Sequence, residues 1–458
     1  MTIDPLDPLD PLDPDALRTR LDELVREHGI TGAAIAVAAG DETAEAATGL
    51  LNARTGRPAT TDSLFQIGSI TKAWTATLIL QLVGEGRLDL DQTAQSVLPE
   101  LVLPEPVTIR QLLAHTGGFE GDVFVDTGRG DDAIEKLVAL LKDVPRLAPP
   151  GAVWSYNNAG YVVLGRIVEV LRGVPYNTAL RTHLIAPLGL THAATCADEA
   201  ILHDTAVGHA GGEPVPVWSL MRSNDPAGAS LAMRAGDLLA FARAHMRGDP
   251  AVLPASTARL MREPQVALPD LGRPGHWGLG WELPRWTGGT VAGHDGSTPG
   301  QAATLRLVPD AGVAVALLTN GGDLDPLRAG LVEPILRRLA GVVPPDPSAP
   351  PAPPLPIDVP RYAGRYVSEV TAWEVAGDET GRLWVTVTPL GVMAEHGGPR
   401  RFELARLRGD TFVFAEAQGG VHPAVAFVGA GDGDGDGDGD GEGDRPRFLH
   451  TGRLNVRT

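Results

Sequence analysis

The sequence contains a single cysteine, Cys196, in 458 residues. One thiol excludes an intrachain disulfide and a zinc cluster built from thiolates. No stretch approaches the ~18 consecutive apolar residues of a membrane helix. The N-terminus also lacks the basic segment and the apolar stretch of a secretory signal. We therefore expect a cytoplasmic protein without a membrane segment.

Basic residues are too few and too scattered to form a stripe that neutralises phosphates, so nucleic acid is not an expected partner. The formal net charge is −19, but the acidic residues are concentrated. Residues 1–15 and 431–444 hold twelve acidic side chains and no basic one, which leaves about −7 for the rest. The whole chain is 43% hydrophobic, which is enough for a large core.

Changes in composition divide the chain. Residues 1–15 repeat Asp-Pro-Leu and predict a disordered acidic tail. Prolines crowd residues 343–360, which predicts a linker between a main domain at 16–342 and a smaller domain at 361–458. A Gly-Asp repeat falls within 430–444 and predicts a flexible, solvated hairpin loop in the smaller domain. A calcium site there is the alternative, but the repeat lacks the hydrophobic position of calcium-binding repeats.

Periodicity indicates helices and strands in the main domain. Helical spacing of apolar residues covers 16–28 and 326–339, and the segment 70–83 is apolar nearly all round, as in a helix buried mid-domain. Short apolar runs at 32–38 and 312–320 predict buried strands. The pattern predicts a sheet covered by helices.

The smaller domain alternates apolar and polar residues in short runs, such as 383–387 and 411–414. Alternation of this kind is typical of strands with one buried face. We expect a small all-β domain.

Ser69 and Lys72 stand three residues apart at the start of the buried helix, so both side chains point to one face. A serine hydroxyl is a weak nucleophile until a base takes its proton, and a lysine can do so once burial favours its neutral form. The helix N-terminus also favours a developing oxyanion. An accidental pair with a solvated lysine is the alternative.

Tyr156, in Tyr156-Asn157-Asn158, is one of only five tyrosines. Beside a lysine, a phenol can be partly ionised and can relay a proton to a leaving group. A core or surface ring with a satisfied hydroxyl is the alternative.

A third motif, Gly293-His294-Asp295-Gly296-Ser297, follows later in the chain. Gly296 lets a substrate approach the backbone, and the Ser297 N–H could complete a two-donor oxyanion hole. His294 could donate to Tyr156 or to the substrate, although a histidine beside glycine can also be a simple turn residue.

The order and content of these motifs resemble the penicillin-binding-protein and class C β-lactamase-like serine hydrolases, which carry Ser-x-x-Lys, Tyr-x-Asn and then Lys-Thr-Gly or His-x-Gly. The resemblance implies an α+β, β-lactamase/transpeptidase-like fold: an antiparallel sheet flanked by helices, plus an all-helical region. Residues 361–458 resemble the small lipocalin-like domain that several such hydrolases append. The matching segments are Ser69-Ile70-Thr71-Lys72, Tyr156-Asn157-Asn158, His294-Asp295-Gly296, residues 65–68, 112–118 and 187–190.

The resemblance also implies roles. Ser69 would attack a carbonyl, Lys72 would take its proton, and Tyr156 would pass it to the leaving group. The Ser69 and Ser297 N–H groups would bind the oxyanion, and Asn158 would hydrogen-bond Lys72 or the substrate. No cofactor or metal is expected.

His294 stands where true β-lactamases and DD-peptidases carry a lysine that pairs with the substrate carboxylate. A mostly neutral imidazole is a poor anion anchor, and Arg306 on the following strand is another candidate for that task. The departure favours esters, small amides, thioesters or D-amino-acid peptides over β-lactams.

Three functions are consistent with the motifs. The first is an esterase or amidase acting on a small-molecule or peptidyl substrate through an acyl-enzyme at Ser69. The second is an acyltransferase or peptide-cyclising thioesterase that passes the acyl group to an amine or alcohol, with a carrier-protein-bound thioester as a possible donor. The third is a catalytically silent binding homologue, against which the intact Ser69, Lys72 and Tyr156 argue.

Overall fold

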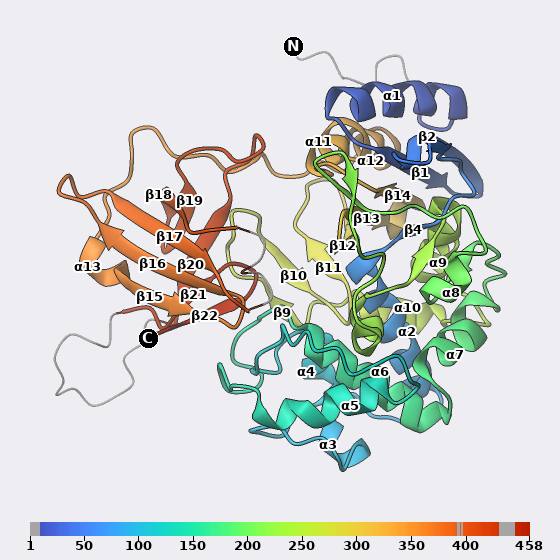
Figure 1. Ribbon diagram of the computed structural model, residues 1–458, viewed down its shortest axis with the longest axis horizontal. Coiled ribbons are helices and arrows are strands. Elements are labelled where there is room, and N and C mark those ends of the chain that lie inside the picture. The colour runs from blue at the N-terminus through green and yellow to red at the C-terminus, as the bar shows by residue number, and fades with distance from the viewer. Residues whose placement is uncertain (1–9, 392–393, 395–396, 430–444) are drawn as a thin grey trace.

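A computed structural model describes residues 10–391, 394, 397–429 and 445–458. The chain forms a large body of sheet and helices and a smaller barrel beside it (Figure 1). The α+β class and the β-lactamase/transpeptidase-like arrangement expected from the sequence are confirmed, and so is the all-β C-terminal region.

Within the described residues, nine antiparallel strands make the central sheet of the large body. In spatial order they are β3 (Arg57–Pro58), β2 (Glu42–Asn52), β1 (Gly32–Ala39), β14 (Val313–Thr319), β13 (Gln301–Val308), β12 (Ala292–Thr298), β11 (Glu282–Pro284), β10 (Gly275–Trp277) and β9 (Val266–Ala267).

The middle of this sheet is buried on both faces, which explains why β1 and β14 are continuous apolar runs. Ile35 and Val315 pack on one face against α1 (Pro14–Glu27) and α12 (Glu333–Ala340). Ala36 and Ala316 belong to the core on the other face, where α9 (Ala235–Arg247) packs on the sheet. Because side chains alternate between faces, a strand buried on both sides needs an apolar residue at every position.

The helical region lies below the sheet in Figure 1 and surrounds α2 (Thr71–Gly84). Trp74 of α2 stacks on Phe241 of α9 with ring centroids 4.0 Å apart. The helix is buried on every side, as its composition predicts. The neighbouring helices are α3 (Ala94–Val97), α4 (Ile109–Leu113), α5 (Ala133–Leu140), α6 (Asn158–Arg172), α7 (Tyr176–Leu180), α8 (Ala197–Ala200) and α10 (Ala255–Met261).

Two smaller sheets lie in the large body. The first carries the segment before Ser69 and runs β4 (Phe65–Gln66), β8 (Ala232–Met233) and β5 (Ala193–Ala194); the second pairs β6 (His209–Ala210) with β7 (Glu213–Pro214).

The C-terminal strands close into an antiparallel barrel, with β15 paired to β22. Aromatic rings fill it, including Tyr362, Tyr366, Phe412 and Phe427. The strands are β15 (Gly364–Val367), β16 (Thr371–Gly377), β17 (Leu383–Pro389), β18 (Arg400–Arg408), β19 (Thr411–Phe414), β20 (Ala424–Val428), β21 (Phe448–His450) and β22 (Leu454–Arg457), with the short α13 (Val359–Tyr362) before them.

Some boundaries differ from those expected. Helix α1 begins at Pro14, inside the segment expected to be a tail, because the Asp13 side chain caps it by accepting from Asp15 N at 3.0 Å and proline suits the first helical turn. The helix expected at 326–339 is interrupted by a π turn, Arg328–Val332, between α11 (Asp325–Leu327) and α12. The predicted loop at 430–444 and residues 1–9 lie outside the described residues.

The proline-rich segment after Val343 contains no helix or strand up to residue 358, but it contacts both bodies. The Ser348 hydroxyl donates to Gly272 O at 2.9 Å, and Arg406 of the barrel donates to Pro356 O at 3.0 Å. Arg408 of β18 also pairs with Asp270 at 2.6 Å. The barrel is therefore fastened to the large body.

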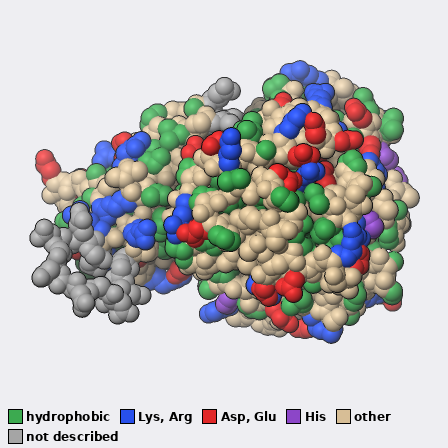
Figure 2. Space-filling view, turned by 90° about the horizontal axis from the view of Figure 1, so that it is seen from below, with side chains coloured by type: hydrophobic (Ala, Val, Ile, Leu, Met, Phe, Trp, Pro, Cys, Tyr) green, Lys and Arg blue, Asp and Glu red, His purple; other side chains and the backbone are tan. Residues whose placement is uncertain are grey.

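The surface in Figure 2 shows basic and acidic side chains interspersed over both bodies on this face. Among the described helices, none combines the length and apolar character needed to cross a bilayer.

Candidate active site

Ser69 lies in a 3-10 turn, Gly68–Ile70, that continues directly into α2. Gly68 has φ +51°, and a Cβ there would stand 2.5 Å from Ser297 N. A Cβ on Gly296 would stand 1.9 Å from Ile67 O and 3.0 Å from Ser69 N. Glycine at both positions lets β12 lie against this turn, so the backbone N–H groups of Ser69 and Ser297 are brought to one place.

The Lys72 Nζ donates to Ser69 Oγ at 3.1 Å and to Ala227 O at 2.6 Å. The Lys72 side chain is fully buried. Burial lowers the pKa of Lys72 well below its usual value, and Arg453 lowers it further, while Asp122 opposes the shift. Lys72 is thereby poised to take a proton from the hydroxyl that it contacts.

A buried carboxyl group, that of Asp225, lies in the same turn as Ala227. Asp225 and Ala227 belong to one 3-10 turn, Arg222–Ala227. Asp225 accepts from Ser230 Oγ at 2.6 Å and from Asn177 Nδ2 at 2.9 Å. Burial raises the pKa of Asp225 to about 6, although both hydrogen bonds oppose the shift.

The ring centroid of Tyr156 lies 4.8 Å from Lys72 Nζ, and its hydroxyl is close enough to Ser69 for that residue to lower the pKa of the phenol. Burial raises the pKa of Tyr156, so the phenol is in its neutral form at ordinary pH. The partly ionised phenol considered from the sequence is therefore disfavoured. The hydroxyl retains its proton and can exchange it with Ser69.

His115, which sequence reasoning did not single out, packs against the ring of Tyr156. Its ring centroid lies 4.4 Å from that of Tyr156, and its Nδ1 accepts from Asn157 N at 3.0 Å. His115 has φ +57°, the left-handed region that few non-glycine residues occupy. Burial lowers its pKa, so the ring stays neutral and can accept this hydrogen bond.

The barrel holds the segment that carries Tyr156. Tyr156 N donates to Gly452 O at 3.0 Å, His450 Nε2 donates to Trp154 O at 2.8 Å, and Leu454 N donates to the Ser155 hydroxyl at 3.2 Å. These contacts come from the β21–β22 hairpin.

Arg453, at the tip of the same hairpin, also reaches the site. Its Cζ lies 5.1 Å from the centroid of the Tyr156 ring, and its Nε forms an ion pair with Asp122. No local motif marks Arg453 in the sequence, so only the packing of the barrel reveals it.

Asn158 is the first residue of α6, and its side-chain amide donates to Asp122 Oδ1 at 2.8 Å. The expected partners were Lys72 or the substrate. Asp122 accepts from Asn158 and forms an ion pair with Arg453, so in this structure Asn158 supports the ion pair of Asp122. Its role in binding substrate stays a prediction.

His294 lies on β12 just beyond Gly293, the residue that pairs with Glu282 of β11. Its Nδ1 donates to Asp295 O at 2.6 Å, and its buried Nε2 has no hydrogen-bond partner among the described residues. Burial and the nearby Lys72 lower the pKa of His294 to about 3. The ring is therefore neutral and lies 6.2 Å from that of Tyr156, centroid to centroid.

Arg306 was the other candidate for a carboxylate anchor. It is buried, and its two terminal nitrogens donate to the two Asp295 oxygens at 2.7 and 3.0 Å. Asp295 also accepts from Thr304 and Arg328. Since Arg306 is bound to a carboxylate of the protein, it is not available to a substrate.

These groups line one cleft of about 520 Å³. Apolar rings and side chains form much of its wall, and the barrel supplies Gly452 and Arg453. Of the predicted site residues, Ser69, Tyr156, His294, Gly296 and Ser297 line the cleft, and Lys72 lies beneath Ser69. The other lining residues are Trp154, Leu268, Pro269, Leu271, Arg273, Trp277, Glu282 and Asp295. In the part of the chain that is described, no group of three or more His, Cys, Asp or Glu residues is placed to hold a metal ion.

The chain is similar to proteins of a known family and to solved structures. Residues 17–338 match the protein family described as Beta-lactamase. The chain is 44% identical over 368 residues to penicillin-binding protein 4 of Amycolatopsis lactamdurans, covering 76% of this chain and 96% of that protein. It is 30% identical over 353 residues to the esterase EstB of Burkholderia gladioli, covering 65% of this chain and 88% of that protein.

Among solved structures, the crystal structure of SurE is similar over both bodies. It has a TM-score of 0.77 at 29% identity and covers 97% of this chain and 99% of that one. A second structure of SurE contains D-Leu and gives a TM-score of 0.75 at 28% identity over the same shares of the two chains.

Proposed function

The chain belongs to the beta-lactamase family, and we propose that it is a serine hydrolase that forms an acyl-enzyme at Ser69 and cleaves an ester or amide bond. One observation carries the proposal: Lys72 Nζ, fully buried, lies 3.1 Å from Ser69 Oγ. A buried lysine with a lowered pKa is a suitable base for a serine hydroxyl.

In the first step, Lys72 takes the hydroxyl proton of Ser69 as Oγ attacks the substrate carbonyl. The oxyanion that forms accepts hydrogen bonds from the backbone N–H groups of Ser69 and Ser297. Preorganised donors of this kind contribute about 3–4 kcal/mol each to transition-state stabilisation. The contact between β12 and the 3-10 turn at Ser69 supports this pairing of donors.

In the second step, the proton reaches the leaving group through Tyr156. The neutral phenol donates its proton to the departing oxygen or nitrogen, and the Lys72 ammonium, whose Nζ lies 4.8 Å from the centroid of the phenol ring, returns a proton to the phenolate. Water then attacks the acyl-enzyme, with Lys72 and Tyr156 removing its proton. Ser69 is restored and the acid is released.

The substrate follows from the state of the two expected carboxylate anchors, His294 and Arg306. A neutral His294 cannot pair with a carboxylate, and Arg306 is occupied by Asp295. Esters and amides without a carboxylate beside the scissile bond therefore suit this cleft better than β-lactams. The likeness to the esterase EstB supports an ester substrate.

A fluorophosphonate probe tests the proposal, because it reacts with an activated serine hydroxyl. We expect labelling at Ser69, identified by peptide mass spectrometry, and none in Ser69→Ala. Labelling of the Ser69→Ala variant at the same rate would remove the nucleophile assignment. Absence of labelling in the unmodified protein would favour a silent binding homologue.

A second function is supported by the position of the barrel at the cleft. We propose as the alternative that an amine or alcohol, rather than water, accepts the acyl group, as in a peptide-cyclising thioesterase fed by a carrier-protein-bound thioester. The barrel forms part of the cleft wall and could shield the acyl-enzyme from water or bind the acceptor. Product analysis with p-nitrophenyl acetate and added amines separates the two: amide formation in excess of hydrolysis favours transfer.

A further inference from the structure

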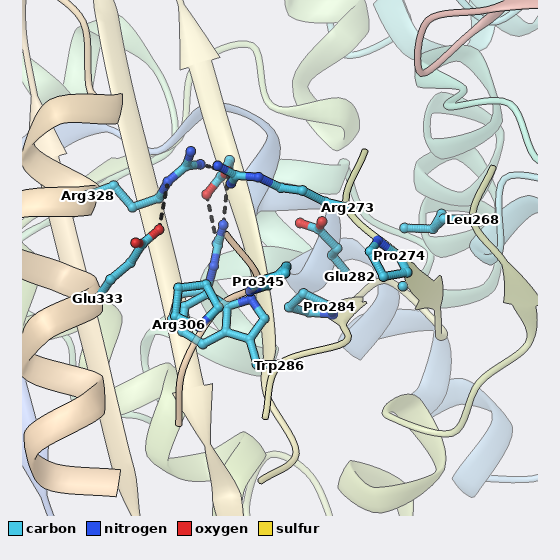
Figure 3. Close-up of a pocket in the computed structure, with 13 residues that line it drawn as sticks. Leu268, Arg273, Pro274, Glu282, Pro284, Trp286, Arg306, Arg328, Glu333 and Pro345 are labelled. Carbon is cyan, nitrogen blue, oxygen red and sulfur yellow. Dashed lines mark hydrogen bonds and ion pairs between the residues drawn. The ribbon is translucent and has the colours of Figure 1, made fainter. Parts of the chain in front are cut away.

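Glu282 is a carboxyl group in the wall of the cleft that the mechanism does not use. It lies on β11, opposite Gly293 of β12 and Trp277 of β10. It lines the cleft that holds Ser69 and also a cavity of about 80 Å³ behind that wall. Figure 3 shows Glu282 in this side cavity, apart from the ion pairs of Arg306, Arg328 and Glu333.

The neighbouring acidic groups have cationic partners, whereas Glu282 has none. Asp295 is bound by Arg306 and Arg328, at 2.7 and 3.3 Å, and Glu333 lies 3.8 Å from Arg328. Among the described residues, Glu282 makes no hydrogen bond or ion pair through its carboxyl group. Burial raises its pKa, while the charges of Arg306, Arg328 and Arg273 counteract the shift.

Within the described residues no direct partner holds the Glu282 carboxyl group, so this half-buried carboxylate is open to a cation that enters the cleft. Glu282 is also near enough to the chemistry for its charge to act on Tyr156. We propose that Glu282 binds the ammonium group of a substrate, so that the cleft selects acyl donors or acyl acceptors carrying a free primary amine. This specificity rests on the proposed acyl-enzyme at Ser69 and deepens it.

Arg273 is the residue of the protein that could bind Glu282 in place of a substrate ammonium. It is exposed, lines both the cleft and the side cavity, and makes no ion pair within the described part of the chain. If Glu282 serves a substrate ammonium, Arg273 repels that same cation. Arg273→Gln should then strengthen amine binding, because it removes this repulsion.

The test measures protection of Ser69 from fluorophosphonate labelling. Alaninamide with a free amine and N-acetylalaninamide differ in charge at one nitrogen and are compared as competitors. The full chain is used, with Glu282→Gln as the variant and Glu333→Gln as the matched control, since Glu333 lines the side cavity but not the cleft. A second arm measures transfer of the acetyl group from p-nitrophenyl acetate to alaninamide, which separates an amine on the acceptor from one on the donor.

We expect alaninamide to protect Ser69 at lower concentration than its N-acetyl derivative. Glu282→Gln should reduce this preference at least about tenfold, the size expected for one charge-assisted contact, and Glu333→Gln should leave it unchanged. A faster transfer to alaninamide that also depends on Glu282 places the amine on the acceptor; protection without such transfer places it on the donor.

Equal protection by the two amides in the unmodified protein, or an unchanged preference in Glu282→Gln, overturns the proposal. An equal fall in both variants also overturns it, because it indicates a distant electrostatic effect. If the proposed acyl-enzyme function is itself wrong, the result is different, because the unmodified protein would not be labelled at Ser69 at all.

Discussion

Lys72 and Arg453 approach the same phenol ring, with Lys72 Nζ 4.8 Å and Arg453 Cζ 5.1 Å from the centroid of Tyr156. One cation comes from the buried helix α2 and the other from a hairpin of the barrel. Their repulsion lowers the pKa of Lys72. The barrel thus acts on the base of the large body without touching it.

Arg453→Gln should raise the pKa of Lys72, because it removes a cation and leaves the Asp122 carboxylate, which raises that pKa. Lys72 acts as a base only when neutral, so acylation is lost as pH falls through its pKa. The acid limb of the acylation rate should move up by about one pH unit. Stopped-flow acylation by a p-nitrophenyl ester measures it.

Arg408→Gln is the control for this shift, because it breaks another ion pair between the two bodies, that with Asp270. An Arg453→Gln profile that coincides with the unmodified one would show that Arg453 has no influence on the base.

Lys72→Ala should slow acylation of a p-nitrophenyl ester by the ~10²–10⁴ typical of a lost general base. The variant should remain folded only if the cavity near Ala227 O is tolerated, so circular dichroism accompanies the kinetics. A folded variant with a near-normal rate would show that another group takes the proton of Ser69.

His294→Lys should increase acylation by penicillins relative to short-chain esters, because it introduces a charge that can pair with the substrate carboxylate. The unmodified protein, with a neutral His294, should turn over penicillins slowly or not at all while it hydrolyses esters. The ratio of the two acylation rates is the measurement. Efficient penicillin hydrolysis by the unmodified protein, or an unchanged ratio in the variant, would contradict the charge argument.

Cleavage within residues 345–358 should leave a folded 16–345 fragment, because each body has its own core. The fragment should nevertheless be labelled at Ser69 at least about tenfold more slowly, since it lacks the contact from Gly452 to Tyr156 and the charge of Arg453. Added barrel fragment should restore part of the rate. An insoluble fragment would mean that the large body needs the barrel to fold.

Asp225→Asn should stabilise the protein at pH 8 but not at pH 4. The pKa of Asp225 is about 6 in the folded protein, above its unfolded value, so its contribution to stability is complete below about pH 4 and is lost as pH rises through 6. Asparagine cannot ionise, so it avoids the cost of a buried charge. The difference in unfolding free energy between the variant and the unmodified protein at pH 8 should reach about 3 kcal/mol at most.

Urea unfolding at the two pH values tests this, with the exposed Asp198→Asn as the matched control. Equal effects of the two substitutions at pH 8 would contradict the assignment of the raised pKa to Asp225.

Local patterns in the sequence predict much of the fold. The run at 32–38 is apolar at every position because β1 is buried on both faces, and the three-residue spacing of Ser69 and Lys72 places both on one side of a helical turn. Positions 68 and 296 need glycine because a side chain at either would clash where β12 meets the turn at Ser69. Only the structure reveals this contact.

The rest of the site depends on long-range packing. Arg453 follows Asp122 by more than three hundred residues, and no periodicity connects the two. Asn158 could not be assigned to Asp122 from its motif, because several acceptors are compatible with an amide. The proposed role of Glu282 rests on the absence of a partner for its carboxyl group among the described residues. Composition cannot reveal such an absence.

The pairing of β1 with β14 has a consequence for folding during synthesis. Ala33 pairs with Thr319, so the strand that leaves the ribosome early must wait for nearly three hundred further residues before its neighbour exists. During that wait, the exposed edge of β1 is open to wrong partners, as in other chains whose sheets join distant segments. The barrel emerges after the large body, so Tyr156 meets its Gly452 partner only after nearly three hundred further residues have been made. Assembly of a competent site is therefore expected to follow synthesis of the barrel.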